Sequence, residues 1–207
     1  LIDHPASIDK VKHFVGGEGT FDCYHGPVFI DENFVNLCAP GEAIGMHSGG
    51  NLGLMRCQFL VRDGKFHCGQ VNVLIALTDI GPGDGATMVV PGSHKANLEH
   101  PQYAQKVVSQ NGEVASAQGT QGAIEIHMQR GDALLFVDAI THGSALLANE
   151  GMRRIVVYRY GPSWGNFRLP MYPSDELLER LSPRQRSIVL PQQPIRREPN
   201  RIADYPS

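Results

Sequence analysis

Short apolar segments separated by tight turns dominate the chain between residues 58 and 160. The clearest pair is Gln58–Arg62 and Lys65–His67, joined by Asp63-Gly64, a dipeptide that favours a type I′ hairpin turn. Further runs with strand composition follow at 70–78, 86–90, 124–128, 133–136 and 154–160. Short strands with Gly- and Pro-rich turns are typical of an antiparallel sandwich or barrel, so the pattern predicts a mainly β domain.

Two amphipathic segments flank these predicted strands. Residues 7–14 have the pattern of a short helix that begins with Ser7 as its N-cap and ends before Gly16-Gly17. Residues 174–186 have the pattern of one longer helix, with Ser174 as its N-cap and acidic residues in its first turn. We therefore expect a few helices at the margins of the sheets, including a short one at 103–109.

A chain of 207 residues fits a single domain spanning 1–207. The polar segment 96–122 is interpreted as an insertion that acts as a lid over the mouth of the barrel. The proline-rich stretch 187–207 is interpreted as a C-terminal tail. Because the chain starts at Leu1 rather than at Met, we interpret it as a fragment lacking an N-terminal segment.

The charge pattern argues against a polyanionic partner. The net charge is −3, and no block of like charges exceeds the Arg196-Arg197 pair, so neither nucleic acid nor a membrane surface is expected as a partner. The apolar runs are far shorter than the ~20 residues that span a bilayer. These features favour a small-molecule substrate. The four cysteines show no CxxC spacing and are interpreted as reduced thiols of a cytoplasmic protein: Cys23, Cys38, Cys57 and Cys68.

The most informative motif is the segment 77–95, which reads LTDIGPGDGATMVVPGSHK. It is followed by GDALLF at 131–136, by THGS at 141–144 and by Arg153-Arg154. In their order and spacing these pieces resemble the phytanoyl-CoA dioxygenase family over roughly residues 40–195. The resemblance implies a double-stranded β-helix, the cupin-like jelly roll. It also implies an oxygenase that uses Fe(II), 2-oxoglutarate and O₂.

The resemblance also assigns roles to three residues. His47 stands at the place of the first iron ligand, and His142 at the place of the distal histidine. Arg153, eleven residues after His142, stands at the place of the arginine that pairs with the far carboxylate of 2-oxoglutarate. Neighbouring strand residues face opposite sides, so a register shift of one residue would give this role to Arg154.

The sequence departs from the family pattern at position 49, where Gly replaces the expected aspartate ligand. One hypothesis is that water or chloride fills the position, as in the iron halogenases that resemble this family. A second is that Asp138 supplies the carboxylate, because residues 138, 140 and 142 of a strand would face the same interior. Asp138 could equally bond Arg153 or a turn amide. A third is that the domain has lost iron and only binds a ligand.

Further polar residues are candidates for co-substrate binding. Gln70 and Asn72 alternate on one face of an apolar strand, and in the family such residues reach 2-oxoglutarate or the substrate; structural hydrogen bonding is an equal alternative. Ser144 is grouped with them. His94 is interpreted as a structural turn residue. Two aromatic residues are expected either at the substrate mouth or in simple packing: Trp164 and Phe167.

Taken together, the sequence predicts an Fe(II)- and 2-oxoglutarate-dependent oxygenase that hydroxylates an unactivated C–H bond of a small organic substrate. Two alternatives stay open. A halogenase would bind chloride at the ligand position that Gly49 leaves open. A non-catalytic cupin-like barrel would bind a small ligand without iron chemistry.

Overall fold

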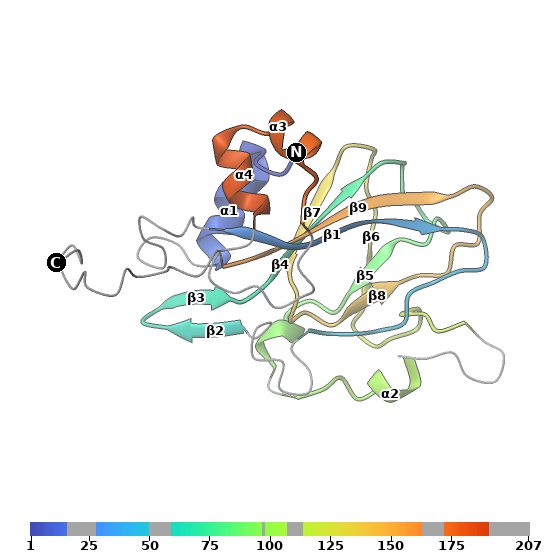
Figure 1. Ribbon diagram of the computed structural model, residues 1–207. Coiled ribbons are helices and arrows are strands. Elements are labelled where there is room, and N and C mark those ends of the chain that lie inside the picture. Colours follow the sequence, from blue (N-terminus) through green and yellow to red (C-terminus); the bar gives the residue numbers. More distant parts are fainter. Residues whose placement is uncertain (16–27, 50–58, 97, 107–113, 163–171, 191–207) are drawn as a thin grey trace, which may run out of the picture.

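The computed structural model describes residues 1–15, 28–49, 59–96, 98–106, 114–162 and 172–190. Its larger sheet is antiparallel, with the strand order β1-β9-β4-β7 (Figure 1). These strands are β1 (Phe29–Cys38), β9 (Arg153–Gly161), β4 (Val71–Ala76) and β7 (Ala133–Val137). The long edge strand β1 was not delineated from the sequence, because Asp31, Glu32 and Asn33 interrupt its apolar pattern.

A second antiparallel sheet, of order β6-β5-β8, lies beside the first (Figure 1). It consists of β6 (Ile124–Ile126), β5 (Thr87–Val89) and β8 (His142–Ser144). Separately, β2 (Phe59–Arg62) and β3 (Lys65–Cys68) form a hairpin. Its turn residues Asp63 and Gly64 both have positive φ angles, 53° and 74°, as a type I′ turn requires. The prediction of a mainly β domain, including this hairpin, is confirmed.

Strand β4 is apolar on nearly every residue because both of its faces are covered. Val71 and Val73 pack into an outer core with residues of helices α1 (Pro5–Val15) and α4 (Pro183–Val189). Leu74 and Ala76 pack into an inner core that also contains residues of both sheets. The helices α1 and α4 therefore close the outside of the larger sheet, and the inner side is left to hold the site.

The helices differ from the prediction at their boundaries. Helix α1 begins at Pro5 rather than after Ser7, because proline suits the first helical turn and His4 Nδ1 accepts a hydrogen bond from the Ala6 amide. The predicted single helix at 174–186 is two helices, α3 (Asp175–Arg180) and α4. Pro183 cannot continue α3, and Ser182 starts α4 with a capping box. None of the described helices is long and apolar enough to cross a membrane.

The segments interpreted as a lid and a tail are described in part. The short helix α2 (Tyr103–Lys106) lies in segment 96–122, and residues 107–113 lie outside the described structure. Ala117 is buried, and its amide donates to the carbonyl of Ser144 in β8. At the other end, α4 extends to Val189 and Ile188 is buried in the outer core, so the first residues of the predicted tail are helical; residues 191–207 lie outside the described ranges.

Candidate active site

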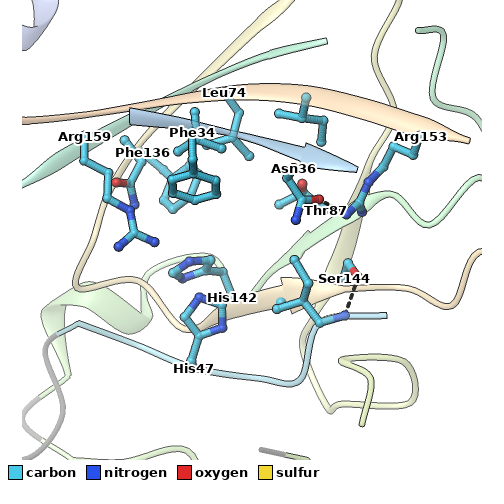
Figure 2. Close-up of a pocket in the computed structure, with 15 residues that line it drawn as sticks. Phe34, Asn36, His47, Leu74, Thr87, Phe136, His142, Ser144, Arg153 and Arg159 are labelled. Atoms are coloured by element: carbon cyan, nitrogen blue, oxygen red, sulfur yellow. Dashed lines mark hydrogen bonds between the residues drawn. The ribbon is translucent and has the colours of Figure 1, made fainter. Parts of the chain in front are cut away.

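A cavity of about 70 Å³ lies between the inner faces of the two sheets (Figure 2). One wall comes from β1, β9, β4 and β7, and the opposite wall from β5, β8 and the segment before β2. The lining residues are Phe34, Asn36, Ile44, His47, Asn72, Leu74, Thr87, Phe136, His142, Gly143, Ser144, Arg153, Ile155, Val157 and Arg159. The predicted His47, His142, Ser144, Asn72 and Arg153 are thus brought to one place.

His47 and His142 are direct neighbours although many residues separate them in the sequence. Their backbones exchange two hydrogen bonds, from His47 N to His142 O at 2.7 Å and from His142 N to His47 O at 2.8 Å. The centroids of the two imidazole rings are 4.0 Å apart. This bridge joins the segment before β2 to β8, and it presents two nitrogen donors to the same cavity (Figure 2).

The backbone fixes which ring nitrogen faces the cavity. Nδ1 of His47 lies 3.0 Å from the Gly45 carbonyl, and Nδ1 of His142 lies 2.8 Å from the Ile140 carbonyl. Because a carbonyl oxygen only accepts, each Nδ1 carries the proton, and in the neutral ring Nε2 keeps a lone pair. Burial lowers the pKa of His142 well below its usual range, and the neighbouring His47 lowers it further. His142 is therefore neutral at pH 7, as a metal ligand must be.

The close approach of β8 to this segment depends on Gly143. A Cβ atom at this position would lie 2.8 Å from the Ile44 carbonyl oxygen and 3.0 Å from that of Gly45. Next to it, the Ser144 hydroxyl accepts a hydrogen bond of 2.8 Å from the Ile44 amide. The sequence Thr141-His-Gly-Ser144 thus combines one cavity imidazole with the residues that allow the two segments to meet.

Arg153 is the inward-facing member of the arginine pair. It is 3% exposed and lines the cavity, whereas Arg154 is exposed on the opposite face of β9. The Arg153 guanidinium donates to the Gly85 carbonyl through Nη1 and to Asn36 Oδ1 through Nη2, the latter at 2.6 Å. Its Nε is buried without a hydrogen-bond partner in the described part of the chain. A fixed cation with a spare donor therefore closes one end of the cavity.

Asp138 lies close by but is committed to another contact. Its carboxylate accepts a hydrogen bond of 2.7 Å from Asn72 Nδ2. Strand β7 ends at Val137, so Asp138 lies in a turn, and the alternation assumed for 138, 140 and 142 does not apply. Within the described ranges, no group of three His, Cys, Asp or Glu side chains is placed to hold a metal ion. In the described structure Asp138 lies with Asn72 and not in a three-ligand group with the two histidines, and its role as a metal ligand stays a prediction.

The two predicted amides have different surroundings. Asn72 is 1% exposed and lines the cavity, and because the Asp138 carboxylate only accepts, the Asn72 amide nitrogen points to Asp138. Asn72 Oδ1 is buried without a hydrogen-bond partner among the described residues. Gln70 does not line the cavity, since it precedes the start of β4 and its amide donates to Asp31 Oδ2 at 3.1 Å.

Three polar side chains of the cavity were not singled out from the sequence: Asn36, Thr87 and Arg159. Asn36 belongs to β1, whose pairing with β9 is not readable from composition. Thr87 lies in the motif 77–95, and Arg159 continues the inward alternation of β9 that includes Arg153. This alternation was the available signal for Arg159. His94 lies outside the cavity lining, against the Phe59 ring.

The remaining predicted residues do not change the site. The Ser93 hydroxyl accepts a hydrogen bond of 2.8 Å from the Thr141 amide, which ties the turn after β5 to the start of β8. Trp164 and Phe167 fall outside the described residues.

Comparison with known proteins identifies a matching family and solved structures with a similar fold. The profile of the phytanoyl-CoA dioxygenase family matches residues 2–155. One similar solved structure is HygX from Streptomyces hygroscopicus with nickel, 2-oxoglutarate and hygromycin B bound. It is 25% identical to this chain in sequence and superposes with a TM-score of 0.64. The match covers 84% of this chain and 69% of HygX. HygX with iron bound is 24% identical, with a TM-score of 0.63, covering 84% of this chain and 72% of that one. The predicted double-stranded β-helix is confirmed.

A curated relative is similar over a shorter stretch. The dioxygenase cdmD of Talaromyces verruculosus is 25% identical over 124 residues, which are 58% of this chain and 35% of cdmD. The matched stretch therefore spans about a third of that relative's length.

Proposed function

The chain belongs to the phytanoyl-CoA dioxygenase family, and on that premise we propose that it is an Fe(II)- and 2-oxoglutarate-dependent oxygenase that hydroxylates a C–H bond of a small organic substrate. One observation carries the proposal: His47 and His142 meet in a single cavity that also holds the buried guanidinium of Arg153. A small-molecule substrate is in keeping with the HygX structure that holds hygromycin B.

The side chains fit the metal and the co-substrate in part. The Nε2 lone pairs of His47 and His142 are suitable donors for Fe(II), and Arg153 is suited to a carboxylate. Two protein ligands leave more open positions than the usual three, and these positions accommodate a chelating keto acid and O₂. When bound, Fe(II) with 2-oxoglutarate and O₂ supplies the oxidation of the C–H bond, and 2-oxoglutarate is converted to succinate and CO₂.

The protein positions 2-oxoglutarate and keeps water out of the cavity. Arg153, held by Asn36 and the Gly85 carbonyl, binds the far carboxylate of 2-oxoglutarate, and the nearby hydroxyls of Thr87 and Ser144 line the same end of the cavity. Fixing the acid in this way presents its keto end to the histidines. Water is excluded by the apolar part of the wall, formed by Leu74, Phe136, Ile155 and Val157.

Halogenation is a second candidate because of Gly49. This residue offers no carboxylate, and its amide donates to the Asp138 carbonyl at 2.8 Å. If neither Asp138 nor another carboxylate binds the metal, chloride is a suitable ligand for the open position. We rank hydroxylation first, since a glycine alone does not select chloride over water.

Anaerobic titration tests the proposal. Fe(II) is added to the protein with 2-oxoglutarate, and the weak visible charge-transfer band of the chelate is followed, with and without chloride. Succinate formation is then measured after O₂ is admitted. We expect a band and iron-dependent succinate in the wild-type protein and in His127→Ala, whose imidazole is exposed and paired with Glu125.

We expect both signals to be lost in His47→Ala and His142→Ala. A band that shifts with chloride supports the halogenase alternative. Absence of both band and succinate in the wild-type protein would leave the non-catalytic barrel as the better description.

A further inference from the structure

Strand β9 carries two arginines on its inward face, and the proposed function assigns only one of them, Arg153, to 2-oxoglutarate. Arg153 and Arg159 line the same cavity, with Ile155 and Val157 between them. Figure 2 shows the two guanidinium groups at opposite ends of the pocket, with His142 and His47 between them. Among the described lining residues, these arginines are the charged ones and no carboxylate faces the cavity. The end occupied by Arg159 therefore presents a guanidinium with no assigned ligand, and Glu32, which is not among the lining residues, pairs with it.

Two side-chain contacts and the sheet register fix the position of Arg159. Its Nη1 forms a 2.9 Å ion pair with Glu32 Oε2, the residue opposite it in the β1–β9 ladder. Its guanidinium carbon lies 5.4 Å from the centre of the Phe34 ring, and its cross-strand neighbour in β4 is Asn72. The side chain of Arg159 is only 17% exposed. A guanidinium held in this way is preorganised for a ligand.

One edge of this guanidinium has no acceptor among the residues that the structure describes. Glu32 takes Nη1, while Nε is buried and has no hydrogen-bond partner in the described part of the chain. Nε and Nη2 together form a planar edge with two parallel donors, which matches the two oxygens of a carboxylate. A buried donor without a partner is destabilising, so a ligand that supplies acceptors here binds favourably.

The charge balance of the filled site points the same way. The two carboxylates of 2-oxoglutarate are assigned to the metal and to Arg153. Because position 49 is Gly, the site has one negative charge fewer than a site with the usual aspartate ligand. In a cavity of low dielectric, the absence of that aspartate lowers the cost of binding an anionic substrate, and Glu32, paired with Arg159, offsets part of the remaining positive charge.

We propose that Arg159 binds a carboxylate of the substrate, so that the enzyme acts on a small organic acid whose carboxylate is fixed beside the two histidines. The inference rests on the proposed function, because it assigns Arg153 to the co-substrate. Arg159 is then the residue that determines substrate class, and the aromatic Phe34 and Phe136 flank the substrate carbons.

Binding to a redox-inert form of the protein tests this proposal without turnover. Protein is loaded with Mn(II) and saturated with N-oxalylglycine, an unreactive analogue of 2-oxoglutarate. Butyrate, hexanoate and octanoate are compared with their primary amides, which have nearly the same shape and no charge. Mn(II)-induced relaxation of the probe protons reports both the affinity and the closeness of the probe to the metal.

We expect at least one acid to bind close to Mn(II) and about 10- to 100-fold more tightly than its amide. Arg159→Gln should abolish this preference and keep the affinity for N-oxalylglycine, which also shows that the variant is folded. Arg159→Lys should keep part of the preference, and Arg154→Gln, on the opposite face of β9, should keep all of it.

Several outcomes overturn the inference. Equal affinity of acids and amides does so, as does an acid preference that persists in Arg159→Gln, because the acid would then bind Mn(II) directly. Loss of N-oxalylglycine in Arg159→Gln but not in Arg153→Gln would make Arg159 the co-substrate anchor instead. Failure of the wild-type protein to bind Mn(II) and N-oxalylglycine overturns the proposed function itself, and this inference with it.

Discussion

Asn36 Oδ1 accepts a 2.6 Å hydrogen bond from Nη2 of Arg153, and this contact ties the edge strand β1 to the cation at the end of the cavity. Removal of the amide in Asn36→Ala leaves Arg153 less firmly oriented while its charge persists. We expect the KM for 2-oxoglutarate to rise about 5- to 30-fold, with little change in kcat, because ground-state and transition-state binding are weakened alike. Steady-state succinate formation measures both constants.

Asn33→Ala is the matched control, since Asn33 lies on the same strand with its side chain exposed. If Asn36→Ala lowers kcat and leaves KM unchanged, Asn36 acts on the reaction itself and not through Arg153.

Arg153 and Arg154 provide a direct test of strand register. Arg153 is buried in the cavity wall and Arg154 is exposed on the other face of β9. We expect Arg153→Gln to weaken N-oxalylglycine binding to the Mn(II) protein by about 30-fold or more, since a charge-assisted contact to a carboxylate is lost, and Arg154→Gln to leave it unchanged. Calorimetric titration measures both. An equal effect of the two substitutions would contradict the assignment.

Much of the fold was predictable because its signals are local. The Asp63-Gly64 turn, the apolar run of β4 and the Ser174 N-cap each depend on residues close in sequence, and each is confirmed. The division of the predicted C-terminal helix was missed because Pro183 and the Ser182 capping box outweighed the amphipathic pattern around them. Strand β1 was missed because its sequence lacks a clear strand pattern. Its extended structure depends instead on pairing with β9, which is distant in the sequence.

The candidate site shows the same division between local and long-range information. His142 and Arg153 were located by motif order, and the structure places both in one cavity. The contacts of Asp138 and Asn36 depend on where β7 ends and on how β1 pairs, and neither follows from spacing. Strand alternation failed for Asp138 because a turn separates it from β8.

Tyr160 gives the domain a defined response to alkaline pH. Its ring is 1% exposed in the outer core, and its hydroxyl donates to the Ile2 carbonyl at 2.9 Å. Burial raises the pKa of Tyr160, with smaller contributions from Tyr158 and Asp3. Above about pH 10 the unfolded chain releases this proton and the folded chain retains it, so the free energy of unfolding should fall by up to ~1.4 kcal/mol per pH unit.

Urea unfolding of Tyr160→Phe between about pH 9 and pH 11 tests this expectation. The variant should be less stable by about 1 kcal/mol at neutral pH and should show a flatter alkaline slope. Tyr172→Phe is the control, because Tyr172 is 75% exposed. An unchanged slope in Tyr160→Phe would show that another group causes the alkaline loss.

Gly143 allows strand β8 to lie close enough to the segment before β2 for the two histidines to meet. Because an added Cβ would lie 2.8 Å from the Ile44 carbonyl, Gly143→Ala must push β8 away from the segment that carries His47. We expect a loss of about 1–3 kcal/mol in stability, together with weaker Mn(II) binding. Thermal unfolding with and without Mn(II) measures both effects. Gly81→Ala is the control, since its Cβ would lie 3.5 Å from the nearest side-chain atom; equal effects would exclude a specific role for Gly143.

Gly49→Asp tests what occupies the position of the missing ligand. The substitution returns a carboxylate two residues after His47, where the family pattern has one. If that position faces the metal, Mn(II) affinity should rise roughly tenfold and any effect of chloride on the Fe(II) charge-transfer band should disappear, because the open site is filled. Ser48→Asp adds the same charge one residue away, where the native hydroxyl bonds the Ala139 carbonyl, and should do neither. Equal gains in Mn(II) affinity in both variants would mean that the added charge acts at a distance. No gain in Gly49→Asp would mean that the third ligand lies elsewhere. Asp138→Asn would then be the next variant to titrate with Mn(II).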